Sequence, residues 1–397
     1  MIPFIDLQAQ RQRIAPQIAA AVTRVIEHGG YVLGPEVAEL ESKLSEFVSS
    51  ESNTIPHTVT CGSGTEGLSM VLMAWGVGSV SGGSAKDAVF CPAFTFVATA
   101  EVVALVGAVP FFVDVEEDSF NMSPASLAAA IIEAKNQGLI PRVVIAVDLF
   151  GQAANYSAIL PIAAEAGLRV LCDAAQAFGG EVTLAGSNHR QKIGSVGHAT
   201  VTSFFPAKPL GCYGEGGAIF SCDMDLVVKL KSIRAHGMGE DRYQNIRLGI
   251  NGRLETIQAA ILLQKLTIFA DEIDLRQGVA AHYDRLLSDM GAVAKGVKLP
   301  RVAAGNLSAW AQYTVILPMG CDRARVIAEL KSAEIPSMVY YPIPLNRQVA
   351  YCDFPLVAAG VGVSESLAER VLSLPMHPYL AVETQMRIAE VFCRAIF

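Results

Sequence analysis

A single lysine, Lys208, stands in the apolar and glycine-rich segment VTSFFPAKPLGCYGEGGAIF (201–220), between two expected strands. An ammonium group placed there loses hydration, which lowers its pKa and favours the free amine needed to form an imine with an aldehyde. The flanking glycines let backbone pass close to a bound ligand. The residue types alone leave a second interpretation open, because an isolated lysine in a turn is usually a surface residue.

An aspartate and a glutamine follow the apolar run in LCDAAQAFGG (171–180). Asp173 would lie at the carboxyl end of a buried strand, which is where open parallel sheets bind ligands. A carboxylate there could hold a protonated pyridine nitrogen and keep a cofactor ring an electron sink. Gln176, three residues on, could share its face. On this segment alone Asp173 could equally be a helix N-cap.

Two more segments could contact such a ligand. In TCGSGTEGL (60–68), glycine and hydroxyl residues lead into an apolar helix whose free N–H groups could bind a phosphate, although an ordinary small-residue cap has the same letters. In CPAFTFVATAE (91–101), Phe94 or Phe96 could stack on a flat heteroaromatic ring. An aromatic residue in such a place is more often part of the core.

The segment RLGINGRLETIQAA (247–260) holds Asn251 and Arg253 in a turn before a long helix. Both side chains could bind an anion such as a phosphate or a carboxylate. A solvated loop that caps the helix would have the same residues. The histidines and cysteines show no metal-ligand spacing, so we expect no metal.

The candidate site residues must be positioned by helices and strands. Along the chain, apolar runs alternate with Ala- and Leu-rich helical stretches. This pattern predicts an α/β fold with a mostly parallel sheet covered by helices on both faces. A long helical pattern from Leu254 to Met290 leads out of it. We expect a large domain over residues 1–260 and a smaller α+β domain over 261–397. The expected strands include 88–90, 109–115, 143–150, 168–173 and 311–317, and the expected helices include 14–28, 35–49, 124–136, 154–166, 322–333 and 383–396.

The composition narrows the class of protein. Of the 397 residues 52% are hydrophobic and 17% charged, and the net charge is -8 without a basic cluster, so nucleic acid is an unfavoured partner. The first residues lack the pattern of a signal peptide, and no apolar run is long enough to span a membrane. Eight scattered cysteines indicate buried, reduced thiols in a cytoplasmic protein.

The order and spacing of these motifs resemble one family. FIDLQAQ, YVLGPEVAELE, GSGTEGL, PAFTFVATAE, DAAQAFG, SFFPAKPLGCYGEGGA, NGRLETIQAA and YYPIPLN occur in the order of the DegT/DnrJ/EryC1/StrS sugar aminotransferases. The resemblance covers nearly the whole chain. It implies the type I fold of aspartate aminotransferase and pyridoxal 5′-phosphate as cofactor, with pyridoxamine phosphate as its amino form.

The resemblance also implies roles for the residues around the cofactor ring. Lys208 would bind the cofactor covalently and transfer protons. Asp173 would pair with the pyridine nitrogen, Gln176 would contact the oxygen side of the ring, and Phe96 would stack on it.

For the cofactor phosphate, the resemblance implies Gly64, Thr65 and Ser203. Asn251 would reach the phosphate from the other subunit. The protein is therefore expected to be a homodimer with shared active sites.

Several segments look like the subgroup that aminates C3 of UDP-2-acetamido-2-deoxy-3-oxo-glucuronate with L-glutamate as donor, in the making of bacterial O-antigen and lipopolysaccharide. In that subgroup the arginine that matches Arg253 is implicated in binding the sugar carboxylate. Tyr340 and Tyr341 would line the sugar site. Tyr340 is a departure, because the subgroup tends to have histidine there and tyrosine supplies no positive charge.

That departure favours a different substrate, a 4-keto-6-deoxy sugar linked to UDP, dTDP or GDP. The same fold also occurs in sugar 3-dehydratases, in which histidine replaces the lysine, and in regulatory relatives without turnover. The lysine at position 208 argues against a dehydratase, and Lys208, Asp173 and Ser203 together argue against a regulator.

Overall fold

The computed structural model of the protein describes residues 2–49, 56–241 and 243–396. Its centre is a seven-stranded sheet with the strand order β1-β9-β8-β5-β4-β2-β3. The strands of this sheet are β1 (His57–Cys61), β2 (Asp87–Pro92), β3 (Val109–Val113), β4 (Ile140–Val147), β5 (Arg169–Asp173), β8 (Ala199–Ser203) and β9 (Gly217–Ser221).

The sheet is mostly parallel, as the alternating sequence pattern predicts. Among its described strands β9 alone runs against its neighbours, since it pairs antiparallel with both β1 and β8, whereas β8, β5, β4, β2 and β3 pair in parallel. The parallel strands are almost wholly buried, as expected for a sheet covered on both faces. Their carboxyl ends lie at one edge, which is where such sheets bind ligands.

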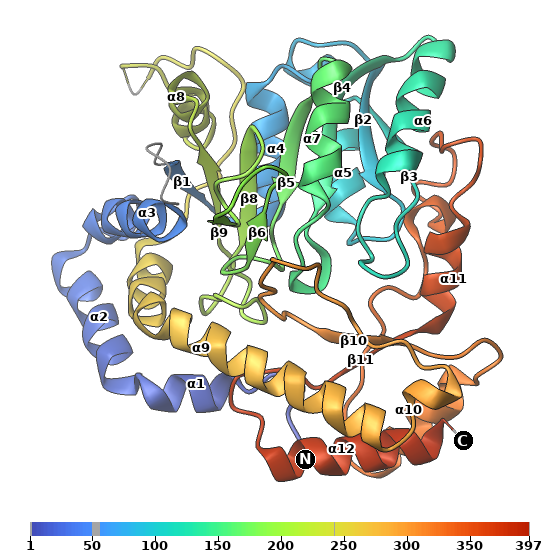
Figure 1. Ribbon diagram of the computed structural model, residues 1–397. Helices are drawn as coiled ribbons and strands as arrows, with labels where there is room; N and C mark the ends of the chain where they lie inside the picture. Colours follow the sequence, from blue (N-terminus) through green and yellow to red (C-terminus); the bar gives the residue numbers. More distant parts are fainter. Residues whose placement is uncertain (1, 50–55, 242, 397) are drawn as a thin grey trace.

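Helices cover both faces of the sheet (Figure 1). One group packs together on one face; it consists of α4 (Gly64–Ala74), α5 (Ala98–Leu105) and α8 (Met224–Ile233). The other group consists of α6 (Pro124–Asn136) and α7 (Tyr156–Glu165), which pack together on the opposite face. This arrangement is the α/β layering that the type I fold requires.

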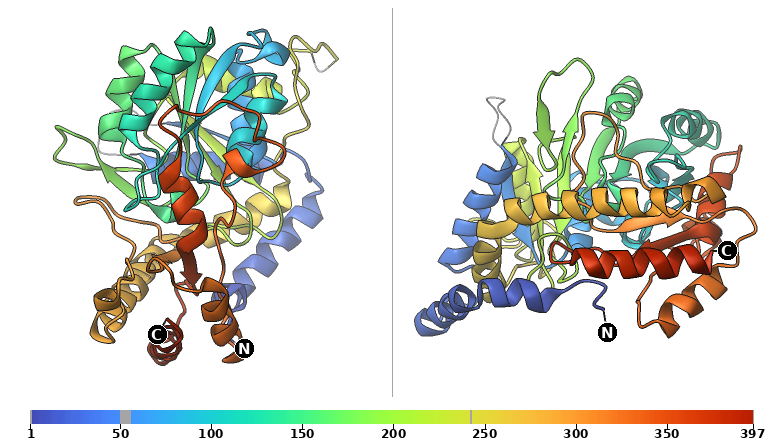
Figure 2. Two further views of the ribbon diagram at one scale, coloured as in Figure 1. Left: turned by 90° about the vertical axis from the view of Figure 1, so that its right-hand side faces the viewer. Right: turned by 60° about the horizontal axis from the view of Figure 1, so that its bottom comes forward.

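A 34-residue helix, α9 (Thr256–Asp289), runs beneath the sheet domain and confirms the long helical pattern expected from residue 254 to residue 290. The N-terminal helix α2 (Ala15–His28) and the C-terminal helix α12 (Val382–Ala395) both pack on it, as the right-hand view of Figure 2 makes clear. The remaining helices of the N-terminal region are α1 (Leu7–Arg13) and α3 (Pro35–Val48).

The C-terminal part has a hydrophobic core of its own, with Tyr283, Leu330 and Phe392 among its members. Around this core lie the antiparallel pair β10 (Tyr313–Ile316) and β11 (Val371–Leu374), together with α10 (Arg323–Ser332) and α11 (Gly362–Arg370). The expected boundary at residues 260/261 falls inside α9. The division into domains 1–260 and 261–397 therefore stays a prediction.

Two expectations are wrong in detail. The strand expected over 143–150 ends at Val147, because Phe150 has a left-handed backbone (φ 59°) inside the short 3-10 turn Leu149–Gly151, and no strand can continue through it. The cysteines are all free, but Cys222 and Cys352 are exposed rather than buried, since both lie in surface turns. None of the helices in the described ranges is long and apolar enough to cross a membrane.

Candidate active site

Lys208 and Asp173 lie together at the carboxyl edge of the sheet. Asp173 is the last residue of β5, and Lys208 follows the neighbouring strand β8 in the loop that leads to β9. Their charges interact: burial lowers the pKa of Lys208 and raises the pKa of Asp173, and each group's charge opposes the shift of the other. Lys208 and Asp173 come from separate sequence segments, and the pairing of β5 with β8 brings these segments together.

Burial sets the protonation of Lys208. It lowers the pKa of the Lys208 amine, and the nearby Asp173 charge opposes this effect without reversing it. The residue as a whole is partly exposed, although its amine is almost wholly buried. A desolvated amine is more readily neutral, and the neutral form is the one that attacks a carbonyl group.

The carboxylate of Asp173 is fixed from two sides. Its Oδ1 accepts a hydrogen bond from the N–H of Ala175 (3.1 Å), and its Oδ2 accepts a long one from the hydroxyl of Thr99 (3.4 Å). Asp173 is 7% exposed, and burial raises its pKa although these bonds and Lys208 act to lower it. A buried carboxylate with so few protein partners suits a cationic ring nitrogen.

Gln176 shares this site and is held at both ends of its amide. Its Oε1 accepts a hydrogen bond from the N–H of Phe150 (2.7 Å), and its Nε2 donates to the hydroxyl of Tyr341 (3.2 Å). Tyr341 comes from the loop after α10, far along the chain. The amide therefore joins the sheet domain to the C-terminal part within the site.

The start of α4 forms a cradle of backbone against the end of β8. A Cβ placed on Gly64 would lie 2.9 Å from the Cβ of Ser203, so only glycine allows this approach. The hydroxyl of Ser63 caps the helix by accepting the N–H of Glu66 (3.1 Å), which leaves the N–H groups of Gly64 and Thr65 for another acceptor. The N-terminus of an eleven-residue helix beside a serine hydroxyl fits a phosphate.

The two phenylalanines of the 91–101 segment differ in environment. Phe94 is fully buried, whereas Phe96 is 52% exposed. The Phe96 ring lies 6.1 Å from the ring of Tyr341 at an angle of 41°. Of the two, only Phe96 has a face open for a ligand ring to stack on.

Asn251 and Arg253 bind each other in the described chain. The Nε and Nη2 atoms of Arg253 both donate to Asn251 Oδ1, at 2.9 and 2.6 Å. Their loop contacts the segment that leads into α4, because the N–H of Gly62 donates to the carbonyl of Gly252 (3.0 Å). Both residues thus lie near the start of α4, and their side chains bond to each other rather than to the lysine and aspartate at the sheet edge.

Tyr340 lies beside Tyr341, with ring centroids 5.8 Å apart, and its ring also packs against Phe4 at 6.4 Å. Burial raises the pKa of Tyr340, so the phenol stays neutral. Across the described ranges, no three His, Cys, Asp or Glu side chains come together as metal ligands.

Sequence reasoning missed a second buried aspartate beside the site. Asp148 follows β4 as Asp173 ends β5, and the same signal of an acidic residue after an apolar run could have found it. Its Oδ1 accepts the N–H of Ala154 (2.7 Å) and the hydroxyl of Tyr156 (2.8 Å), so its side chain is directed to α7 rather than to Lys208.

The comparisons with known proteins agree with this geometry. Residues 12–392 match the model of the DegT/DnrJ/EryC1/StrS aminotransferase family. The chain is 45% identical over 380 residues to UDP-2-acetamido-2-deoxy-3-oxo-D-glucuronate aminotransferase of Pseudomonas aeruginosa, and the match covers 96% of each protein.

Two solved structures extend the comparison. A DegT DnrJ EryC1 StrS aminotransferase from Brucella abortus is 47% identical with a TM-score of 0.90 and covers 99% of this chain and 98% of its own. NtdA from Bacillus subtilis with bound cofactor PMP is 25% identical with a TM-score of 0.84. The match covers 100% of this chain and 85% of the NtdA chain. The chain, with its lysine and aspartate at the sheet edge, belongs to the DegT/DnrJ/EryC1/StrS aminotransferase family.

Proposed function

We propose that this aminotransferase holds pyridoxal phosphate on Lys208 and moves an amino group from L-glutamate to UDP-2-acetamido-2-deoxy-3-oxo-glucuronate. The position of Lys208 near Asp173 at the carboxyl edge of the sheet supports the assignment of the cofactor. The 45% identity to the Pseudomonas enzyme over nearly the whole chain supports the sugar. The setting we propose is the cytoplasm, in the biosynthesis of bacterial O-antigen and lipopolysaccharide.

The residues at the sheet edge fit the cofactor. Asp173 would receive its ring nitrogen, Gln176 its ring oxygen and Phe96 a face of the ring. Gly64, Thr65 and Ser203 would hold its phosphate, because the glycine cradle and the capped helix start leave N–H groups for an anion. When bound, pyridoxal phosphate supplies an electron sink for the carbon that carries the amino group.

Lys208 is the group that moves protons. Burial keeps its Nζ neutral more readily than that of an exposed lysine, so Nζ could accept a proton from the substrate carbon, hold it and give it back. The Asp173 carboxylate would face the ring nitrogen of the cofactor, and its bonds from Ala175 and Thr99 fix the direction of its oxygens.

Arg253 would bind the carboxylate of the uronate, since a guanidinium can grip a carboxylate with two hydrogen bonds. It already grips a single amide oxygen in this way, that of Asn251. Tyr340 and Tyr341 would line the sugar. Because neutral Tyr340 adds no positive charge, a 4-keto-6-deoxy sugar nucleotide is the second candidate.

A homodimer with shared sites belongs to the same proposal, with Asn251 serving the phosphate of the other subunit. The loop that carries Asn251 also exposes Ile246 and Leu248, which are 54% and 66% exposed in the single chain. Apolar side chains clustered on a loop next to the cofactor cradle are typical of an interface.

The substrate is tested by incubating the enzyme and L-glutamate with a panel of keto-sugar nucleotides. The panel contains the 3-oxo-glucuronate, its analogue with a neutral C6 and 4-keto-6-deoxy sugars linked to UDP, dTDP and GDP. We expect the highest kcat/KM for the 3-oxo-glucuronate. Arg253→Gln should raise KM for the uronate by about 10–100-fold, the loss of a charge-assisted bond, and leave the neutral analogue nearly unchanged. A preference for a 4-keto-6-deoxy sugar would replace the proposed substrate by the second candidate.

A further inference from the structure

We infer that Asn121 is a positioning residue for the proposed reaction: it holds the turn over residues 149–152 in the form that orients the amide of Gln176. This inference rests on the proposed function, in which the Gln176 amide contacts the ring oxygen of the cofactor. Asn121 itself lies behind the turn and reaches the site only through it.

The turn has a backbone that a bulky residue rarely adopts. Phe150 is left-handed, at φ 59° and ψ 11°, and Gly151 follows at φ 101°. Such a conformation persists where surrounding contacts impose it, and it is a reason to look for a function. Here the left-handed backbone sets the direction of the Phe150 N–H, which donates to Gln176 Oε1 at 2.7 Å.

Asn121 holds both sides of this turn. Its Oδ1 accepts the N–H of Leu149 (2.9 Å), and its Nδ2 donates to the carbonyl of Gln152 (3.0 Å). The residue is 2% exposed, so these bonds are made in a dry environment where an unsatisfied group is costly. One side chain therefore fixes the residues before and after Phe150 and Gly151.

A second support comes from the segment before β10. The hydroxyl of Ser308 and the N–H of Ala309 both donate to the carbonyl of Gly151, at 3.0 and 2.9 Å. A Cβ on Gly151 would lie 2.5 Å from the nitrogen of Trp310, so the two segments touch through backbone.

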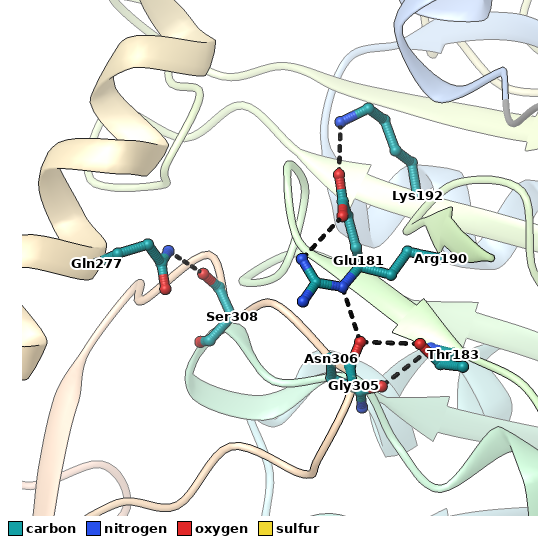
Figure 3. Close-up of polar contacts among 8 residues, drawn as sticks. All are labelled: Glu181, Thr183, Arg190, Lys192, Gln277, Gly305, Asn306 and Ser308. Atoms are coloured by element: carbon teal, nitrogen blue, oxygen red, sulfur yellow. Dashed lines mark hydrogen bonds and ion pairs between the residues drawn. The ribbon is translucent and has the colours of Figure 1, made fainter. Parts of the chain in front are cut away.

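Figure 3 shows how this segment is itself held. It lies against the hairpin of β6 (Glu181–Thr183) and β7 (Arg190–Lys192). The side chains of Thr183 and Arg190 both donate to the carbonyl of Gly305, at 2.8 and 2.9 Å. From α9, Gln277 donates to the carbonyl of Ser308 (2.7 Å). The support behind the turn is thus anchored to the hairpin and to α9.

The consequence for Gln176 is a fixed orientation of its amide. With Oε1 bound to the N–H of Phe150, the Nε2 end faces Tyr341 and keeps a second N–H for an oxygen outside the chain. If the Phe150 N–H turned away, the amide could rotate by half a turn and present its oxygen instead. An oxygen there would repel the ring oxygen that the N–H would otherwise bind.

The test compares Asn121→Ala, Gln176→Ala and the double variant, each loaded with pyridoxal phosphate. The readout is the pH midpoint of the bound cofactor's visible absorbance, which responds to the hydrogen bond on the ring oxygen. We expect Asn121→Ala to shift this midpoint in the same direction as Gln176→Ala, and the double variant to shift it no further than Gln176→Ala alone. Additive shifts would overturn the inference.

Asn346→Ala is the matched control, because Asn346 is a similarly buried asparagine whose Nδ2 donates to Glu365 (2.9 Å) and not to the turn. It should lose stability as Asn121→Ala does and leave the absorbance midpoint unchanged. If Asn121→Ala does not fold, Ser308→Ala should give a smaller shift of the same sign. A midpoint that moves equally in the Asn346 variant, or not at all in the Asn121 and Ser308 variants, would contradict a positioning role.

A cofactor-free measurement separates the inference from the proposed function. Amide hydrogen exchange at Phe150 in the unloaded protein should rise in Asn121→Ala and in Gln176→Ala but not in Asn346→Ala. If this holds while Gln176→Ala leaves the absorbance midpoint unchanged, the positioning stands and the proposed contact of Gln176 with the ring is wrong. Unchanged exchange at Phe150 in Asn121→Ala would refute the positioning itself.

Discussion

Among the described residues, burial lowers the pKa of two lysines, Lys208 and Lys265, and only Lys208 is placed for chemistry. Lys208 lies in a glycine-rich loop at the sheet edge, partly exposed and within the field of Asp173. Lys265 lies within α9 with no exposed surface, and its amine has no hydrogen-bond partner among the described residues. Burial lowers the pKa of Lys265 to about 8.

The difference shows that a lowered pKa alone does not make a catalytic amine. The Lys265 amine sits 4.4 Å from the centre of the Tyr213 ring, a cation–π contact that stabilises it in place. Lys208 differs in position: it is a partly exposed residue among glycines, and its charge partner Asp173 ends the neighbouring strand at the carboxyl edge of the sheet. The charge partner of Lys265 is Glu272, within the same helix. Exposure and a place at the sheet edge, rather than desolvation or a carboxylate alone, separate the two sites.

The largest effect should come from Lys208→Ala. Both the covalent attachment of the cofactor and the proton transfers depend on this amine, so turnover should fall about 10⁴-fold or more. The visible absorbance of the covalently bound cofactor should be lost as well. Lys265→Met, measured alongside, should keep both turnover and absorbance. Equal losses in the two variants would remove the distinction between the lysines.

A smaller loss is expected for Asp173→Asn, which keeps the shape of the side chain and removes its charge. The cofactor would lose its ionic partner, and kcat should fall by about 10²–10³-fold, the usual effect of removing one electrostatic contact. Asp148→Asn is the matched control, since this neighbouring aspartate faces Tyr156 and burial raises its pKa to about 8. Stopped-flow half-reactions with L-glutamate should show less than about a threefold change in the control. A loss in the control as large as in Asp173→Asn would show that the site does not distinguish the two carboxyls.

The smallest effect concerns stability. Because the pKa of folded Lys265 is about 8 and its ordinary value is 10.5, the unfolded chain binds a proton that the folded protein releases between these pH values. The free energy of unfolding should therefore rise with pH through this window, by up to about 1.4 kcal/mol per pH unit. Lys265→Met should lack this rise and be more stable at neutral pH by about 1–3 kcal/mol. Denaturant titrations at neutral pH and near pH 10 measure both; a variant that is less stable and keeps the rise would contradict the assigned burial.

The scaffold was largely readable from the sequence, since apolar runs and helical stretches alternate without interruption. The parallel strands and α9 follow from periodicity alone. The left-handed Phe150 was not readable, because the bonds that impose it come from Asn121 and Ser308, 29 and 158 positions away. The hairpin of β6 and β7 was also missed, since its strands are three residues long and mostly polar.

At the site, residue type identified a functional candidate where the residue was unusual for its surroundings. It did not do so where the residue was common. A lysine among glycines stands out, and the family resemblance resolved its two interpretations. Asp148 and Asp173 have the same sequence signal, and only their partners tell them apart. The proposed role of Asn251 depends on a second subunit, which the residue pattern of one chain cannot place.

The central claim is that the cofactor is bound covalently to Lys208. Borohydride reduction of the holoenzyme makes that link permanent, and digestion followed by mass spectrometry identifies the modified lysine. The account predicts the added mass of the cofactor on the peptide that contains Lys208 and on no other. The added mass on Lys265, or on any lysine outside the 201–220 segment, would contradict it.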